Sequence, residues 1–261
     1  MAGASYCAGS IAAGPEVLVY PAGPSVPENL LRIELRLAQP LHGPLIVEHV
    51  KLEGTDGQPI DDVFLDLPLS SADGRRVTLL LHPGRVKSGL GANLRLGRAL
   101  KTGSAVVLVV DDPAVGAPIR KSWQVVAPDT VAPHPQDWTL SAPAAGSYMP
   151  LIVHMDGAIN SSSEALIAIR GRNGKRLSGT ITLVDSETQW QFVPTRRWRP
   201  GRYALVTHPD LEDEAGNRAC AVYEMPNASV APCDHGTVTY FSVAANGGVA
   251  NGSGRRGGPT R

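Results

Sequence analysis

The sequence predicts an all-β protein of two successive domains, and three observations support that class. The chain has 261 residues, more than most single domains hold, which favours two domains of roughly 100 to 130 residues. Its 28 glycines and 22 prolines separate short apolar runs rich in Val, Leu and Ile, a pattern typical of many strands joined by turns. The second half of the chain also repeats the order of segments found in the first half.

The first strands are predicted from the alternation of apolar and charged residues. Residues 29–37 (NLLRIELRL) alternate after Leu31, which predicts a strand with one buried face and one face in water. The face expected in water carries Arg32, Glu34 and Arg36. Residues 46–52 (IVEHVKL) alternate as a second strand, which runs into a hairpin signal, the Asp-Gly pair at 56–57.

Four segments of the second half match four of the first half in the same order. The segment that begins at Pro143 answers the one that begins at Pro21, an offset of 122 residues (143 minus 21). The Asn-Gly pair at 173–174 takes the hairpin position of the pair at 56–57, and the strands expected at TQWQFVP and GRYALVT answer VTLLLHP and SAVVLVV. This repetition predicts a tandem duplication.

The domain limits follow from composition. We expect a flexible N-terminal segment at 1–14, a first domain at 15–127, a Pro-rich linker at 128–137, a second domain at 138–243 and a disordered tail at 244–261. Because a Pro-rich linker is semi-rigid, we expect the two domains to sit end to end with limited bending.

The second copy carries a resemblance to a known family. A strand that opens after Pro143, the penultimate strand GRYALV and the closing LEDEAGN are similar to bacterial Ig-like domains of the S-layer-protein type (SbsA), over residues 138–225. The first copy departs from the pattern, with DDPAVGAP in place of the Gly-Asn closure and Val106 or Val107 in place of the tyrosine. The resemblance implies two tandem Ig-like antiparallel β-sandwiches. It also implies a secreted, periplasmic or cell-surface spacer, adhesion or ligand-binding module, and no particular reaction.

Composition and motifs narrow the function. Lys plus Arg equals Asp plus Glu at 24 each, so no broad basic surface for nucleic acid or an anionic membrane is expected. No apolar run reaches the roughly 18 residues of a membrane span, and the first twenty residues lack the pattern of a signal peptide. Without a G-x-S-x-G elbow, a hydrolase nucleophile has no support either. We therefore expect a non-enzymatic module without a cofactor, whose partner is a protein or a cell-surface ligand.

An acidic turn at residues 208–218 (HPDLEDEAGNR) allows two interpretations. In the first it is a structural turn, in which Asp213 accepts backbone N–H bonds and Gly216-Asn217 supplies positive φ. In the second it is a calcium site outside the EF-hand class. The calcium ligands would be Asp210, Glu212, Asp213 and the Asn217 carbonyl.

A copper site is a second metal alternative. His154 lies on an expected strand, with Met149 and Met155 close by in the sequence. Imidazole and thioether groups suit copper. The alternative is that His154 is an ordinary strand residue, half covered at the edge of a sandwich.

The first domain contains an insertion at residues 82–99 that the second lacks. It carries four basic residues and no acid, which predicts contact with an anion or a partner; the four are Arg85, Lys87, Arg95 and Arg98. In the alternative interpretation the insertion is a solvated loop, or packs over the open end of the sandwich through Val86, Leu90, Leu94 and Leu96.

The cysteines favour an oxidising compartment. Cys220 and Cys233 flank a Pro-bounded turn, and a bridge between them would stabilise the fold by about 3 kcal/mol. We expect this bridge, which would leave Cys7 without a partner in the chain.

Overall fold

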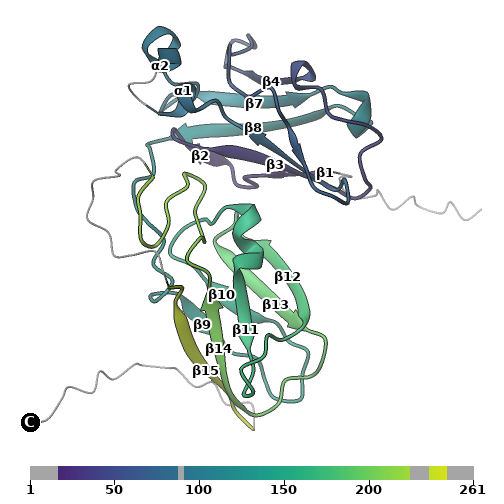
Figure 1. The fold of residues 1–261 in the computed structure, drawn as a ribbon, viewed down its shortest axis with the longest axis vertical. Coiled ribbons are helices and arrows are strands. Elements are labelled where there is room, and N and C mark those ends of the chain that lie inside the picture. Colours follow the sequence, from purple (N-terminus) through teal and green to yellow (C-terminus); the bar gives the residue numbers. More distant parts are fainter. Residues whose placement is uncertain (1–16, 88–90, 224–234, 246–261) are drawn as a thin grey trace, which may run out of the picture.

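The computed structural model describes residues 17–87, 91–223 and 235–245, which form two β-sandwiches in succession (Figure 1). The first contains strands β1 (Val17–Tyr20), β2 (Ser25–Pro27), β3 (Arg32–Leu37), β4 (Val50–Glu53), β5 (Leu69–Ser70), β6 (Arg76–Leu80), β7 (Ala105–Val110) and β8 (Ile119–Val126). The second contains β9 (Thr139–Ser141), β10 (Leu151–His154), β11 (Ile167–Arg170), β12 (Gly179–Val184), β13 (Gln189–Pro194), β14 (Gly201–Thr207) and β15 (Val238–Val243).

The strand order is that of an immunoglobulin-like fold. In the second sandwich one sheet has the order β9-β10-β13-β12 and the other β11-β14-β15. With its strands lettered A to G in sequence, this is the ABED and CFG arrangement of Ig domains. The first sandwich repeats it as β1-β3-β6-β5 and β2-β8-β7-β4. Here β2 pairs with β8 in parallel, and the other strand pairs of the described residues are antiparallel. The expected class of two tandem Ig-like sandwiches is therefore confirmed.

The segments that match in the sequence occupy equivalent strands. β3 corresponds to β10, β4 to β11, β6 to β13 and β7 to β14. The two hairpins also share their turn geometry, because Gly57 and Gly174 have φ angles of 74° and 72°. In both turns the preceding side chain, Asp56 or Asn173, accepts a hydrogen bond from the backbone two residues on.

Helical turns replace part of one predicted strand and part of the insertion. Residues Val47–His49 form a 3-10 helix, η1, so the strand expected from residue 46 begins only at Val50. A 3-10 helix, η3 (Ser161–Leu166), likewise precedes β11. Residues 82–99 contain two short helices, α1 (Pro83–Val86) and α2 (Gly91–Leu96). A third 3-10 helix, η2 (Pro113–Val115), precedes β8.

Each sandwich has its own apolar core. Leu35, Val77 and Leu108 are 0% exposed in the first, and Leu151, Val153 and Trp190 are 0% exposed in the second. All four tryptophans are buried, as expected for core packing. In the described part of the chain, no helix has the length and apolar character needed to cross a membrane.

A tyrosine ties the second sandwich together at the start of β14. The Tyr203 hydroxyl donates to the Arg199 carbonyl at 2.8 Å, a hydrogen bond back to the chain four residues upstream. This is the tyrosine corner of Ig-like domains. The first sandwich has valine at the matching positions in β7, so it lacks this tie.

Loss of the tyrosine corner should weaken the second sandwich. We expect Tyr203→Phe to lower the free energy of unfolding by about 1 kcal/mol, because the hydrogen bond from the Tyr203 hydroxyl to the Arg199 carbonyl is lost. Urea denaturation measures the change. The control is Tyr240→Phe, whose side chain is 60% exposed. Equal stability of the two variants would contradict the structural role of the Tyr203 hydroxyl.

Candidate functional site

The two sandwiches meet in a polar joint, where the end of the second packs against a sheet face of the first (Figure 1). We define the joint as residues 20–36 and 76 of the first sandwich, residue 129 of the linker, and residues 159–164, 187 and 211–217 of the second. The end-to-end arrangement expected from the linker is wrong. Hydrogen bonds to the linker and to the face of β3 set a different geometry.

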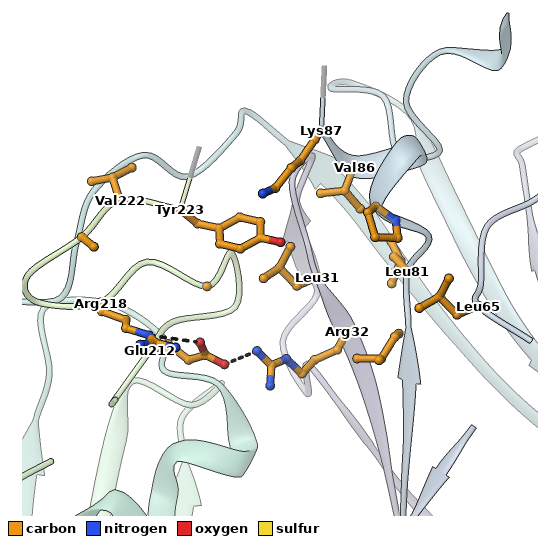
Figure 2. Close-up of a pocket in the computed structure, with 14 residues that line it drawn as sticks. Leu31, Arg32, Leu65, Leu81, Val86, Lys87, Glu212, Arg218, Val222 and Tyr223 are labelled. Atoms are coloured by element: carbon orange, nitrogen blue, oxygen red, sulfur yellow. Dashed lines mark hydrogen bonds and ion pairs between the residues drawn. The ribbon is translucent and has the colours of Figure 1, made fainter. Parts of the chain in front are cut away.

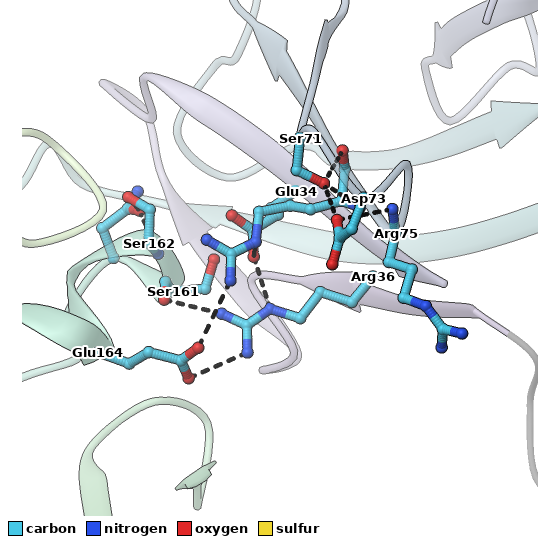
Figure 3. A network of polar contacts seen from close by, with 10 residues as sticks. Glu34, Arg36, Ser71, Asp73, Arg75, Ser161, Ser162 and Glu164 are labelled. Carbon is cyan, nitrogen blue, oxygen red and sulfur yellow. Dashed lines mark hydrogen bonds and ion pairs between the residues drawn. The ribbon is translucent and has the colours of Figure 1, made fainter. Parts of the chain in front are cut away.

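The charged face of β3 was expected in water, but it lies inside this joint. Glu34 is 2% exposed, and Arg36 reaches the second sandwich through Glu164 at 3.0 Å and the Ser161 carbonyl at 2.8 Å (Figure 3). Alternation distinguishes an apolar face from a polar one, but it cannot distinguish water from a polar partner domain.

A network of two arginines and two glutamates fills the joint around Arg36. Arg36 Nε lies 2.6 Å from Glu34, and Arg76 lies 3.6 Å from Glu34 and 3.7 Å from Glu164. The Arg36 guanidinium also stacks over the Tyr20 ring at 4.5 Å. Buried Glu34 and half-buried Glu164 therefore each face two guanidinium groups, the condition under which a buried charge is tolerated.

Two buried asparagines hold the linker from opposite sides. Asn29 donates to the Asp129 carbonyl at 2.8 Å and accepts from the Asp129 N–H at 2.9 Å. Asn217 donates to the same carbonyl at 3.1 Å. Asn29 and Asn217 are 1% and 0% exposed. The linker backbone is thus fixed to both sandwiches, and we call this arrangement the asparagine clamp.

The acidic turn forms the second sandwich's side of the joint. Asp213 accepts from the N–H groups of Ala215 and Asn217 at 2.8 and 2.9 Å, and from the Asn217 side chain at 2.9 Å. Gly216 has a φ of 79°, so the structural interpretation is confirmed at Asp213 and Gly216. Asn217 contributes its side chain to the clamp and not a positive φ.

The candidate calcium ligands do not converge. Glu212 pairs with Arg32 and Arg218 (Figure 2), Asp210 is an exposed partner of Arg218, and Asp213 is enclosed by its own turn. For copper, Met149 is 58% exposed, Met155 packs against the core and His154 contacts Gln189. In the part of the chain that the structure describes, no three His, Cys, Asp or Glu side chains are grouped to hold a metal ion.

The four basic residues of the insertion also diverge. Arg85 is 4% exposed and donates to the Gly97 carbonyl at 2.7 Å. This hydrogen bond connects helix α1 to the residue that follows helix α2. Lys87 lies over the Tyr223 ring at 3.9 Å, Arg98 faces Glu28 at 4.0 Å and Arg95 is exposed. The four therefore do not form one common anion site, and contact of the insertion with a partner stays a prediction.

The packing alternative for the insertion holds in part. Val86 is 2% exposed and belongs to the first core, whereas Leu94 and Leu96 are 78% and 39% exposed. Leu90 lies outside the described residues. One helix of the insertion thus covers the sandwich, and the exposed leucines of the other do not.

A groove of about 660 Å³ lies where the insertion approaches the acidic turn (Figure 2). Its mostly apolar wall includes Leu31, Leu81, Val86 and Tyr223, and the ion pairs of Glu212 lie along one side. The structure therefore brings together two segments that the sequence identified separately. Nothing local in the sequence could show that Leu31 and Tyr223 face the same space.

Three carboxyl groups of the joint are removed from water, with Glu187 and Asp213 buried and Glu214 half-buried. Glu187 is 2% exposed and accepts from the Ala22 N–H at 3.0 Å. Glu187 and Glu214 line a cavity of about 10 Å³ together with Tyr20, Arg32, Glu34 and residues 159–161. Burial raises the pKa of Glu187, raises the pKa of Asp213 to about 7, and raises the pKa of Glu214 to about 8, where neighbouring carboxylates add to the effect.

The predicted disulfide is not tested by the structure. Cys220 follows the acidic turn, but Cys233 and Cys7 lie outside the described residues. The bridge between Cys220 and Cys233 stays a prediction.

Comparison with known proteins adds similar folds and no family. No family model and no curated protein matches the chain. Among solved structures, it is similar to a chimeric titin Z1Z2 with a KLER peptide from decorin, at 11% identity and a TM-score of 0.29, covering 89% of this chain and 97% of that one. It is also similar to titin domains z1z2 in complex with telethonin, at 12% identity and a TM-score of 0.24, covering 88% of this chain and 96% of that one. Domains 5–6 of the S-layer protein SbsC are similar at 8% identity and a TM-score of 0.27, covering 87% of this chain and 96% of that one.

Scores this low add nothing to the strand order, on which the Ig-like assignment rests. They give no support to the SbsA type in particular.

Replacement of Gly216 should disrupt the joint. An alanine Cβ would lie 2.3 Å from a Leu31 methyl group of the first sandwich, at a φ that L-residues avoid. We expect Gly216→Ala to reduce the free energy of unfolding by more than about 1 kcal/mol, measured by urea denaturation. Gly57→Ala is the matched control, because its φ is 74° but no atom lies within 4 Å of the added carbon. Equal losses in both variants would show that backbone strain, and not contact across the joint, sets the effect.

The buried carboxyl groups should make the joint weaker as pH rises. Glu214 keeps its proton up to about pH 8 in the folded chain, against an ordinary pKa of 4.5, so folding is favoured less as pH rises through this interval. We expect Glu214→Gln to be more stable than the parent chain at pH 8 by at least about 1 kcal/mol, with the difference shrinking toward pH 4.5. Thermal unfolding from pH 4.5 to 8.5 measures this. Asp66→Asn, at an exposed position, is the control and should leave the profile unchanged.

Proposed function

We propose that the chain is a non-catalytic Ig-like module that acts as a rigid spacer and as a binding unit for a protein or a cell-surface ligand. The observation that carries this proposal is the joint. The buried polar residues of the acidic turn and of β3 connect the two sandwiches, instead of forming a site open to substrate.

The absence of catalysis and of a resident metal is part of the proposal. Raised carboxyl pKa values are often a sign of acid–base chemistry. Here Glu187 and Glu214 border a cavity of about 10 Å³, which holds a single water molecule at most and no substrate. The acidic turn supports the same view, because its side chains already have protein partners.

The proposed location is outside the cytoplasm, as a secreted, periplasmic or cell-surface protein. The support is the resemblance seen in the second copy and the predicted Cys220–Cys233 bridge, which needs an oxidising compartment. We keep the domain limits of 15–127 and 138–243 as part of the proposal. All the described strands fall within them, and the Pro-rich segment between them contains the residue that the clamp holds.

A spacer requires that the two sandwiches move as one body. We expect amide ¹⁵N relaxation to give one overall correlation time for both sandwiches, because the clamp fixes the linker. Asn29→Ala removes half of the clamp and should give two different correlation times. Asn173→Ala, which removes a side-chain hydrogen bond in a hairpin of the second sandwich, is the control. Independent tumbling of the two sandwiches in the parent chain would overturn the spacer function.

A further inference from the structure

The charges of the second sandwich are separated along its length. We define its distal end as residues 143–150, 170–179 and 194–202, the turns and strand ends that lie farthest from the first sandwich (Figure 1). These three stretches contain no Asp or Glu. They contain eight cations: Arg170, Arg172, Lys175, Arg176, Arg196, Arg197, Arg199 and Arg202. Glu164, Glu187 and the carboxylates of residues 212–214 all lie at the opposite end, in the joint.

Six of these cations line one groove of about 940 Å³. One side is the β11–β12 hairpin, with Arg172, Lys175 and Arg176, and the other is the β13–β14 turn. That turn contributes Arg196, Arg197 and Arg199. None of the residues that line the groove is acidic. The groove therefore has positive charge on both walls.

The distal cations have no carboxylate partners in the described chain. Three of them contact carbonyls and rings instead: Arg176 the Ala165 carbonyl, Arg197 the Gly146 carbonyl and the Tyr148 ring, and Arg202 the Tyr240 ring. In the first sandwich, by contrast, Arg36, Arg76 and Arg120 each pair with a glutamate. Like charges held this close repel one another unless an anion binds between them.

The chain's own C-terminal segment does not supply that anion. Strand β15 ends at Val243, opposite Gly201, so the chain continues from the distal end. Residues 244–261 contain three arginines and no Asp or Glu. The residues given after β15 therefore offer no acidic side chain to neutralise the distal cations.

We propose that the distal groove binds a linear acidic polysaccharide through its carboxylate or sulfate groups. Guanidinium forks bind such oxyanions with two parallel hydrogen bonds, and cations on two walls match anions repeated along a chain. Nucleic acid is the weaker match. The groove's two aromatic residues, Trp198 and Tyr203, are 2% and 8% exposed, so neither offers a face on which bases could stack. This inference deepens the proposed binding function by naming the class of ligand.

The test compares polyanions on the intact chain. Fluorescence anisotropy would measure binding of a labelled heparin oligosaccharide in 50 mM NaCl. The test variant replaces Arg172, Arg176, Arg196 and Arg197 with Gln. The control variant replaces four exposed cations of the first sandwich, Lys51, Arg75, Arg95 and Lys101, with Gln, so the two have equal net charge. We expect about a tenfold or greater loss of affinity in the test variant, less than about a twofold loss in the control, and weaker binding as salt rises.

Competition with other polyanions decides the ligand class. Unlabelled polygalacturonate should displace heparin, whereas neutral dextran should not. Tighter binding of duplex DNA of equal charge, or of anionic phospholipid vesicles, would overturn the assignment to a polysaccharide. No binding of heparin, or equal losses in both variants, would overturn the site itself. If the test variant melts at a lower temperature than the parent, the pair Arg172→Gln and Arg196→Gln replaces it. Failure here leaves the relaxation result at the joint unaffected, so the two proposals fail separately.

Discussion

The relation between the two sandwiches depends on one backbone carbonyl in the linker. Asp129 O accepts hydrogen bonds from Asn29 of the first sandwich and Asn217 of the second, and both side chains are buried. If the linker moved away from either sandwich, the asparagine of that sandwich would lose this acceptor, and a buried amide without a partner is costly. The rest of the joint follows from this point. With the linker held, β3 lies against η3, Arg36 reaches Glu164, and Gly216 comes so close to Leu31 that no side chain fits between them.

The joint is polar, and polar contacts fix an angle better than apolar ones. Hydrogen bonds depend on direction as well as distance, whereas apolar surfaces tolerate sliding. We infer that the polar joint defines the angle between the two sandwiches, and that it is less stable than an apolar joint would be. The backbone hydrogen bond from the Leu31 N–H to the Glu214 carbonyl, at 3.2 Å, restricts the orientation of the two sandwiches in addition to the hydrogen bonds of Asn29 and Asn217. The carboxyl groups of Glu187, Asp213 and Glu214 weaken this joint, because burial makes their ionised forms unfavourable.

Local features of the fold could be predicted from the sequence, and long-range ones could not. The two-residue period identified β3, and short apolar runs identified β6 and β7. The Asp-Gly and Asn-Gly pairs identified both hairpins, because such signals lie within a few residues. Whether the charged face of β3 lies in water or in the joint depends on partners such as Glu164, which is 128 residues from Arg36. The same holds for the insertion, where Arg85 turns inward to the Gly97 carbonyl because the loop folds as two helices. The bend between the sandwiches depended on the pairing of residues 29, 129 and 217, and no local pattern records it.

The distal groove shows why a balanced charge total is a weak guide to function. Equal numbers of acidic and basic residues excluded a uniformly basic surface, but they did not exclude separation of the charges between two ends. The fold produces that separation. Because β11 to β14 run back and forth, the turns after β11 and β13 meet at one end, and those after β10, β12 and β14 meet at the other. The former carry only cations, and the latter carry the carboxylates. The order of strands therefore groups the carboxylates at the end that contacts the first sandwich. It groups the cations at the distal end, where we propose that an external anion binds.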